Sequence, residues 1–237
     1  MQFNEAQIQA IQHNTGPCMV IAGPGSGKTT VLTHRVRYLI ERYGVNPSDI
    51  LVITFTKAAA EQMKLKFKGL SEGRNSAVTF GTFHAVFFTI LKAAYNYSAH
   101  CIIKPQIQHE FVKDQMCRLE LEYDDENEAV AGVLSEISCV KGEDVNIDEY
   151  ESRCIPPQSF RIMYRAYDDM LVRKHLIDFD DMIVQCRELL MQREDYRRAW
   201  QNKYKYILID EFQDINKAQF DVVRILADEY RNLFVVG

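Results

Sequence analysis

A glycine-rich loop near the start of the chain constrains the fold more than any other feature. The loop reads Ala-Gly-Pro-Gly-Ser-Gly-Lys-Thr over residues 22–29. It follows a short apolar run, residues 17–22, and opens a segment, residues 27–43, whose apolar side chains recur with the period of a helix. In this context the backbone N–H groups of the loop and the positive end of the helix bind phosphate. We therefore expect an α/β fold that binds a phosphorylated nucleotide.

Four further apolar runs have the length and composition of buried strands. They cover residues 49–54, 77–80, 206–209 and 232–236. Segments with helical periodicity follow the first three of these runs, at residues 57–69, 83–94 and 217–229. Strands separated by helices imply right-handed βαβ units and a parallel sheet.

The middle of the chain has a different character, because it is mostly helical and contains no clear buried strand. A loop is expected at residues 141–148, and Pro156-Pro157 should break a helix. Residues 105–155 are strongly acidic, with 14 Asp and Glu against 4 Lys and Arg, in a chain whose net charge is −5. We expect a first part of the α/β core, a helical insertion and a return to the core, at residues 1–95, 96–200 and 201–237.

A second motif supplies the carboxylates that a phosphate-binding loop requires. The apolar residues 207–209 run directly into Asp210 and Glu211. An Asp at the end of such a strand holds Mg²⁺ together with the hydroxyl of the loop, here Thr29, while Lys28 reaches the β- and γ-phosphates. Glu211 is suited to polarise a water for attack on the γ-phosphate. The sequence thus predicts ATP and Mg²⁺ as cofactors, and hydrolysis as the reaction.

The cysteine pattern and hydropathy argue against zinc, disulfides and membrane insertion. The six cysteines form no CxxC pair and no regular framework, which favours reduced thiols and a cytoplasmic location. No apolar stretch reaches the ~18 residues of a membrane span. The N-terminus lacks the basic and apolar regions of a signal peptide.

Six short motifs occur in a definite order from residue 3 to the end of the chain. The most specific, besides the phosphate-binding loop, is Ile209-Asp210-Glu211-Phe212-Gln213-Asp214. The others are Phe3-Asn4-Glu5-Ala6-Gln7, Val31-Leu32-Thr33-His34-Arg35, Thr54-Phe55-Thr56 with Ala58-Ala59-Ala60, Gly81-Thr82-Phe83-His84, and Asp178-Phe179-Asp180-Asp181. Together they resemble motif II, the Q motif, the segment after the phosphate-binding loop, motif Ia and two later segments of the UvrD/Rep/PcrA group of superfamily 1 DNA helicases.

The resemblance implies a RecA-like P-loop NTPase domain, called 1A in the family, with a helical 1B insertion. The complete enzyme is then expected to couple ATP hydrolysis to 3′–5′ translocation on single-stranded DNA and to unwind duplex at single-strand/double-strand junctions. The chain stops before motif III, so we expect a second motor domain of the same polypeptide to be missing. The fragment alone should not unwind DNA and should hydrolyse ATP barely, if at all.

The resemblance also implies roles for individual residues. The residues expected to bind the nucleotide are Gln7, which reads the adenine in the family, and Ala22, Gly23, Pro24, Gly25, Ser26, Gly27, Lys28, Thr29 and Thr30. The residues expected to serve catalysis are Lys28, Asp210, Glu211 and Gln213, the last as a γ-phosphate sensor. Thr29 and Asp210 are the expected metal ligands. The residues expected to contact DNA are Phe55, Thr56, Lys57 and His84.

Several of these residues also have purely structural interpretations. Asn4 and Gln7 form a good capping arrangement for a helix, and Phe55 and His84 could belong to the core. For Asp178 we favour a helix cap, with the carboxylates of Asp180 and Asp181 at the positive end of the helix.

Two departures from the family pattern leave other functions open. Thr30 stands where the family usually has Arg, and motif Ia departs at Lys57, Ala58 and Gln62. The alternatives are an AddA/RecB-like helicase–nuclease subunit and a regulatory P-loop ATPase that does not move on DNA.

Overall fold

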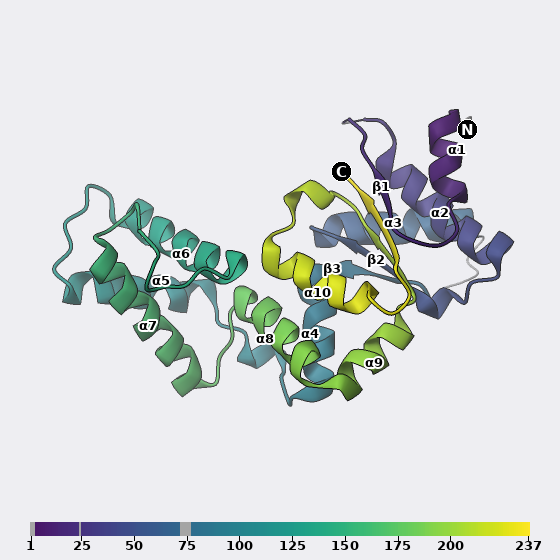
Figure 1. The fold of residues 1–237 in the computed structure, drawn as a ribbon. Coiled ribbons are helices and arrows are strands. Elements are labelled where there is room, and N and C mark those ends of the chain that lie inside the picture. Colours follow the sequence, from purple (N-terminus) through teal and green to yellow (C-terminus); the bar gives the residue numbers. More distant parts are fainter. Residues whose placement is uncertain (1–2, 24, 72–76) are drawn as a thin grey trace.

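The computed structural model describes residues 3–23, 25–71 and 77–237. Its centre is a five-stranded sheet in the order β1-β5-β4-β2-β3, and each neighbouring pair of strands is parallel (Figure 1). The strands are β1 (Cys18–Val20), β2 (Ile50–Thr54), β3 (Thr79–Thr82), β4 (Tyr206–Ile209) and β5 (Asn232–Val236). Each strand overlaps one of the five apolar runs of the sequence, although β3 lies two residues further along the chain than expected. The predicted parallel α/β fold is confirmed.

The central strands are apolar throughout because both faces of the sheet are covered. Side chains alternate along a strand, so Ile50 and Val52 of β2 lie in one core, and Leu51 and Ile53 lie in another. All five residues of β2 are buried. Continuous apolar runs of this kind are typical of a parallel sheet between two layers of helices.

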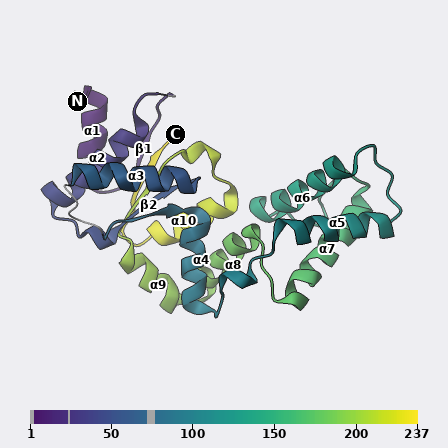
Figure 2. The ribbon, with the colours of Figure 1, turned by 180° about the vertical axis from the view of Figure 1, so that it is seen from behind.

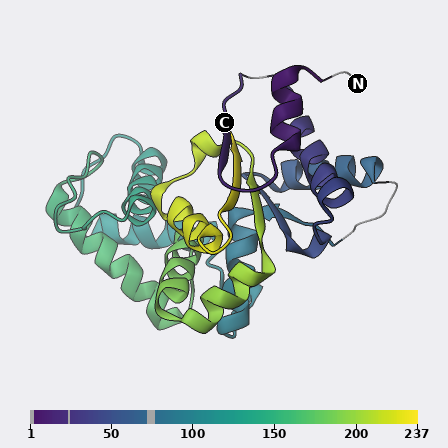
Figure 3. The ribbon, with the colours of Figure 1, turned by 45° about the vertical axis from the view of Figure 1, so that its right-hand side comes forward.

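Two groups of helices form these layers, and Figure 3 shows the purple-to-blue group on one side of the sheet and the green and yellow helices on the other. The first layer contains α1 (Glu5–Gln12), α2 (Lys28–Tyr43) and α3 (Lys57–Leu70). The second contains α4 (Phe83–Ala94), α8 (Phe179–Gln192), α9 (Glu194–Lys203) and α10 (Lys217–Ala227). Three short 3-10 helices are η1 (Pro47–Asp49), η2 (Ala99–Cys101) and η3 (Phe212–Asp214).

A separate helical lobe lies beside the sheet, clearly apart from it in Figure 2. Its helices are α5 (Pro105–Arg118), α6 (Glu126–Glu143) and α7 (Pro157–Lys174), which enclose their own hydrophobic core. The chain leaves the sheet domain and returns to it through two adjacent segments. The amide of Ile103 donates to the carbonyl of Ile177 at 2.9 Å, and the amide of Ile177 donates to the carbonyl of Cys101 at 2.8 Å.

The division of the chain between two hydrophobic cores indicates where the helical insertion ends. Residues 96–200 were expected to form it, yet Cys186 of α8 and Trp200 of α9 belong to the core beneath the sheet. We therefore propose that the inserted lobe ends near Ile177, where the chain rejoins the sheet domain.

Some helix ends differ from the sequence predictions. The expected loop at 141–148 is wrong at its start, because α6 continues to Glu143. Helix α3 does not close at Gly69, since it continues to Leu70 and is capped by Ser71. The break at Pro156-Pro157 is confirmed: Pro156 caps α7 and Pro157 is its first residue. Within the three described ranges, no helix is both long and apolar enough to cross a membrane.

Candidate nucleotide and DNA site

The candidate site residues lie at one edge of the sheet. Because all the strands are parallel, their carboxyl ends meet there, and open α/β sheets bind ligands at this edge. The phosphate-binding loop follows β1, Phe55 follows β2, His84 lies just beyond β3, and Asp210 follows β4. Four segments that are far apart in the sequence thus converge.

The phosphate-binding loop has the backbone that its glycines permit. Gly25 and Gly27 adopt φ values of 76° and 84°, which side chains with a Cβ rarely tolerate. Helix α2 begins immediately afterwards at Lys28, and the amides of Thr30 and Val31 both donate to the carbonyl of Gly27 at 2.9 Å. Pro24 lies outside the described residues.

Lys28 and Glu211 bring the two nucleotide motifs together. Lys28 Nζ lies 3.1 Å from Glu211 Oε2, although 183 positions separate the residues. Glu211 has a φ of 55°, so the chain turns sharply where β4 ends, and strained backbone of this kind is frequent at functional sites. The turn directs the Glu211 carboxylate toward the loop rather than along the strand.

Asp210 is the buried carboxylate of the site, and only 4% of it is exposed. Burial raises the pKa of its carboxyl and the charge of Glu211 raises it further, while Lys28 and a hydrogen bond from Thr29 act in the opposite direction. Among the described residues, Asp210 Oδ1 has no hydrogen-bond partner. A buried carboxylate oxygen without a partner is costly, and oxygen ligands are those that Mg²⁺ prefers. Asp210 and Thr29 therefore fit a divalent cation.

Gln213 completes the acidic turn. Its side-chain amide donates to Glu211 Oε2 at 2.8 Å and to Asp214 Oδ2 at 3.2 Å. The hydrogen bond from Gln213 and the ion pair with Lys28 lower the pKa of Glu211. Glu211 is therefore ionised at neutral pH, and two of its neighbours hold its carboxylate in place.

Gln7 has both a structural contact and a contact with the loop. Its side-chain oxygen accepts from the amide of Asn4 at 3.0 Å, and Asn4 Oδ1 accepts from the amide of Gln7 at 2.8 Å, which is a capping box. The nitrogen of the Gln7 side chain also donates to the carbonyl of Ser26 at 3.0 Å. The capping box thus places the Gln7 amide against the phosphate-binding loop, a contact that the sequence did not predict.

The motif Ia residues lie on the rim between β2 and α3. The half-buried ring of Phe55 packs at 5.3 Å from the ring of Phe83, at an angle of 63°. Thr56 caps α3 by accepting from the amide of Ala59 at 3.1 Å. The Lys57 side chain is 90% exposed and lies 3.9 Å from Glu61. Phe55 is therefore partly a core residue, whereas Lys57 is available to a ligand.

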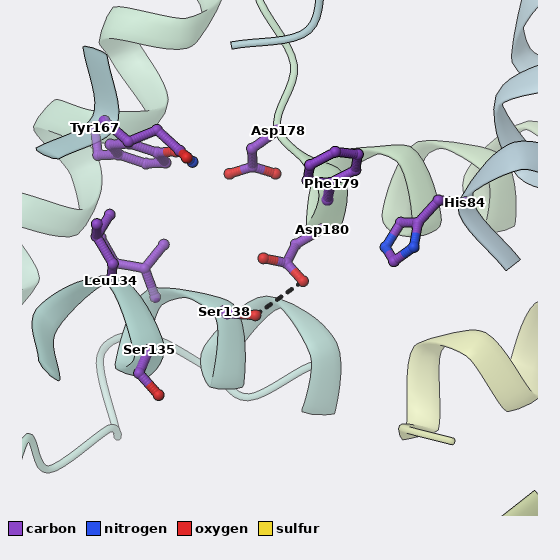
Figure 4. A pocket seen from close by; sticks show the side chains of 10 residues that line it. His84, Leu134, Ser135, Ser138, Tyr167, Asp178, Phe179 and Asp180 are labelled. Atoms are coloured by element: carbon purple, nitrogen blue, oxygen red, sulfur yellow. Dashed lines mark hydrogen bonds between the residues drawn. The ribbon is translucent and has the colours of Figure 1, made fainter. Parts of the chain in front are cut away.

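A cavity of about 540 Å³ opens beside His84, where the sheet domain meets the helical lobe (Figure 4). The ring of Phe179 lies 5.1 Å from that of His84, at 72°. Burial lowers the pKa of His84, which favours the neutral ring. The cavity is also lined by Gln108, Leu134, Ser135, Ile137, Ser138, Tyr167, Asp178 and Asp180.

Phe179 is the residue of this cavity that the sequence interpretation missed. In the sequence interpretation, the three aspartates explain this motif and Phe179 has no assigned role. The structure confirms that Asp178 caps α8 and that it forms a capping box with Asp181. Phe179 is nevertheless 52% exposed, and its ring lines the cavity. The available signal was its sequence position, because Phe179 lies between Asp178 and Asp180, which are themselves interpreted as residues at the start of a helix.

Comparison with known proteins agrees with this geometry. The chain is 32% identical over 247 residues to the ATP-dependent DNA helicase PcrA of Staphylococcus epidermidis, with 99% of this chain and 33% of the relative covered. It is also 32% identical over 244 residues to the ATP-dependent DNA helicase PcrA of Staphylococcus aureus, with the same coverage. The chain thus spans a third of the length of these relatives.

A family profile covers nearly all of the sequence, since the profile of the UvrD/REP helicase N-terminal domain matches residues 3–237. The match includes the phosphate-binding loop, the acidic turn after β4 and the whole helical lobe. The chain belongs to the UvrD/REP helicase N-terminal domain family.

Proposed function

We propose that this chain is the ATP-binding front part of an ATP-dependent DNA helicase that moves along single-stranded DNA. The observation that carries the proposal is the convergence, at the phosphate-binding loop, of Lys28, Glu211 and an oxygen of Asp210 that has no hydrogen-bond partner within the described part of the chain. A loop that binds phosphate, a buried carboxylate and an ionised glutamate are the parts that ATP hydrolysis requires.

Each part has a role in this proposal. Lys28 and the amides at the start of α2 bind the phosphates, and Thr29 and Asp210 hold Mg²⁺. The bound Mg²⁺ supplies positive charge that stabilises the phosphate oxygens. Glu211 is ionised at neutral pH and can take a proton from an attacking water. Gln213, which is hydrogen-bonded to Glu211, would sense the γ-phosphate, as the resemblance implies.

The nucleotide base has a candidate contact on α1. We propose that Gln7 reads the adenine edge, because its side chain reaches the phosphate-binding loop from the adjacent helix. Ala22, Gly23, Gly25, Ser26, Gly27 and Thr30 complete the proposed binding loop, together with Pro24.

Single-stranded DNA is proposed to cross the same edge of the sheet, past β2 and β3. Aromatic rings bind successive bases by stacking, and Phe55, Phe179 and His84 lie in or beside this region. Thr56 and Lys57 begin α3 on the same rim, and exposed lysines there can contact phosphates. The rings of His84 and Phe179 at the cavity wall favour a DNA motor over a regulatory ATPase that does not move on DNA.

The remaining features of the proposed enzyme come from the resemblance of its motifs to the UvrD/Rep/PcrA group. These are 3′–5′ movement, unwinding at single-strand/double-strand junctions, and a second motor domain of the same polypeptide. We propose a cytoplasmic location, supported by six cysteines that are all free of disulfide bonds.

The proposal is tested with the full-length protein and a dT oligonucleotide. The DNA should raise the rate of ATP hydrolysis, and Lys28→Met should abolish both the basal and the stimulated rate because it removes the phosphate contact. Phe55→Ala should weaken stimulation and leave ATP affinity unchanged. A basal rate that does not respond to single-stranded DNA would refute the DNA motor and favour the regulatory ATPase.

A further inference from the structure

A buried lysine joins the helical lobe to the sheet domain. Lys141 lies in the last turn of α6, and its side chain is 5% exposed. Its Nζ contacts three carboxylate oxygens, Asp168 Oδ1 at 3.1 Å, Asp178 Oδ2 at 2.9 Å and Asp181 Oδ1 at 2.8 Å. An ammonium group has three N–H donors, so these contacts match its full capacity. We call these four residues the Lys141 cluster.

The cluster spans two separate hydrophobic cores. Lys141 and Asp168 belong to α6 and α7, which pack around the core of the helical lobe. Asp178 and Asp181 cap and begin α8, which packs beneath the sheet. A cluster of charges built around the buried Lys141 and Asp178 therefore connects the lobe to the sheet domain, close to where the chain crosses between them.

Each of the two carboxylates at the start of α8 uses one oxygen to cap the helix and the other to bind Lys141. Asp178 Oδ1 accepts from the amide of Asp181 at 2.6 Å, and Asp181 Oδ2 accepts from the amide of Asp178 at 3.2 Å. Their other oxygens contact Lys141. Because every oxygen of the capping box has a partner, the first turn of α8 is fixed against the helical lobe.

Phe179 lies between these two carboxylates, as the first residue of α8. It is half exposed, and its ring lies 5.1 Å from that of His84 at the cavity wall (Figure 4). The direction of this ring depends on the backbone of the first turn. That backbone depends in turn on the Lys141 cluster.

We propose that Lys141 is a positioning residue for single-stranded DNA, acting through α8 to hold Phe179 in the cavity where a base stacks. This inference rests on the proposed DNA site. Lys141 does not itself face the DNA, because its Nζ is buried at 5.2 Å from the centre of the Tyr167 ring.

The first test compares Lys141→Met with the parent full-length protein, using a fluorescent dT oligonucleotide. The affinity for DNA should fall about tenfold, an effect comparable to the loss of one stacked base. ATP affinity should be unchanged, since the nucleotide site lies on other elements. The slope of log affinity against log salt concentration should also be unchanged, because no phosphate contact is removed. A lysine that touches a phosphate would instead reduce that slope by about one.

Two further variants separate this inference from the proposed DNA site. Phe179→Ala tests the site itself, and unchanged DNA affinity in that variant overturns the site. Lys205→Met is the matched control, because Lys205 forms an ion pair with Asp49 at 2.9 Å beside the opposite ends of the strands. It should bind DNA like the parent. Lost affinity in Phe179→Ala with parental affinity in Lys141→Met overturns the role of Lys141.

Loss of Lys141 alone leaves carboxylates facing one another without a counter-charge and can unfold the lobe. The triple variant Lys141→Met, Asp178→Asn and Asp181→Asn removes the buried charges together and keeps side chains that can cap α8. It should melt close to the parent temperature and still bind the oligonucleotide more weakly, because no ion pair then connects α6 to the first turn of α8. The ion pair between Asp144 and Arg187, which lies further along α8, remains. Parental affinity in the folded triple variant overturns the proposal.

Discussion

Asp180 shows how a single carboxyl group responds to burial at the cavity wall. Burial and the nearby charge of Asp178 raise its pKa from 3.8 to about 6, while a hydrogen bond from Ser138 and the charge of Lys141 act in the opposite direction. At pH 7 the group is ionised in both the folded and the unfolded state. The raised pKa means that folding is less favourable at pH 7. This cost starts to decline as the pH falls through about 6, where the folded carboxyl binds a proton, and it vanishes near 3.8, where the unfolded carboxyl is protonated too.

Asp180→Asn should therefore stabilise the protein at neutral pH. The shift of roughly 2 pKa units corresponds to ~3 kcal/mol, and partial exposure reduces this to about 1 kcal/mol. Urea unfolding at pH 7 and at pH 5 measures the effect, which should be about half as large at pH 5, because the cost declines across the interval between the two pKa values. The control is Asp195→Asn, whose carboxyl pKa is lowered by a hydrogen bond from Arg193, so that variant should not be stabilised. If Asp180→Asn raised the free energy of unfolding equally at both pH values, the stabilisation would not come from the raised pKa of Asp180.

At the scale of elements, α1 is held to the nucleotide site by a buried arginine of α2. Arg35 is 2% exposed, lies 4.3 Å from the centre of the Phe234 ring, and donates to the carbonyls of Ala10 and His13 at the end of α1. Burial lowers its pKa to about 10, so the guanidinium remains charged at neutral pH. The helix that carries Gln7 is thus fixed at its far end by Arg35.

Replacing Arg35 with Leu should destabilise the protein by about 2 kcal/mol or more, because two carbonyl groups lose their donor in a buried place. Urea unfolding gives the free energy, and hydrogen exchange should show that the α1 amides lose most protection. Arg37→Leu is the matched control, since Arg37 forms an exposed ion pair with Glu41 one turn away worth only ~0.3–0.5 kcal/mol. If both variants lost the same free energy of unfolding, the hydrogen bonds of Arg35 to α1 would contribute no more than an exposed ion pair.

The sequence predicted a helix, strand or loop correctly in two situations. In the first, both faces of a strand are buried, and in the second, the residues that determine the conformation are neighbours in the sequence. Strand β2 could be predicted because both of its faces are covered, and the phosphate-binding loop could be predicted because its glycines precede a helix. The packing partner of α8 could not, since an amphipathic helix shows that one face is buried but not in which core. Lys141 was expected in a loop because a polar, acidic segment follows it, and only the three distant carboxylates that face it explain its burial.

At the scale of the whole molecule, the rate of ATP hydrolysis depends on which groups supply positive charge to the nucleotide site. In the described part of the chain, Lys28 is the cation that contacts Glu211. The family assigns further cations, arginines that stabilise charge on the transferred phosphoryl group, to the second motor domain. Such arginines increase the rate of related nucleotide hydrolases ~10³–10⁵-fold.

The 237-residue chain should therefore bind ATP with Mg²⁺ weakly and hydrolyse it at well below about 1 s⁻¹, the low end of ordinary enzyme turnover. Phosphate release measures the rate, and Glu211→Gln in the same chain gives the background, because it removes the proposed base and keeps a similar shape. Joining the chain to a second motor domain should raise the rate at least ~10³-fold. Turnover above about 1 s⁻¹ in the isolated chain, abolished by Glu211→Gln, would mean that the charge on the phosphoryl group is stabilised within these 237 residues.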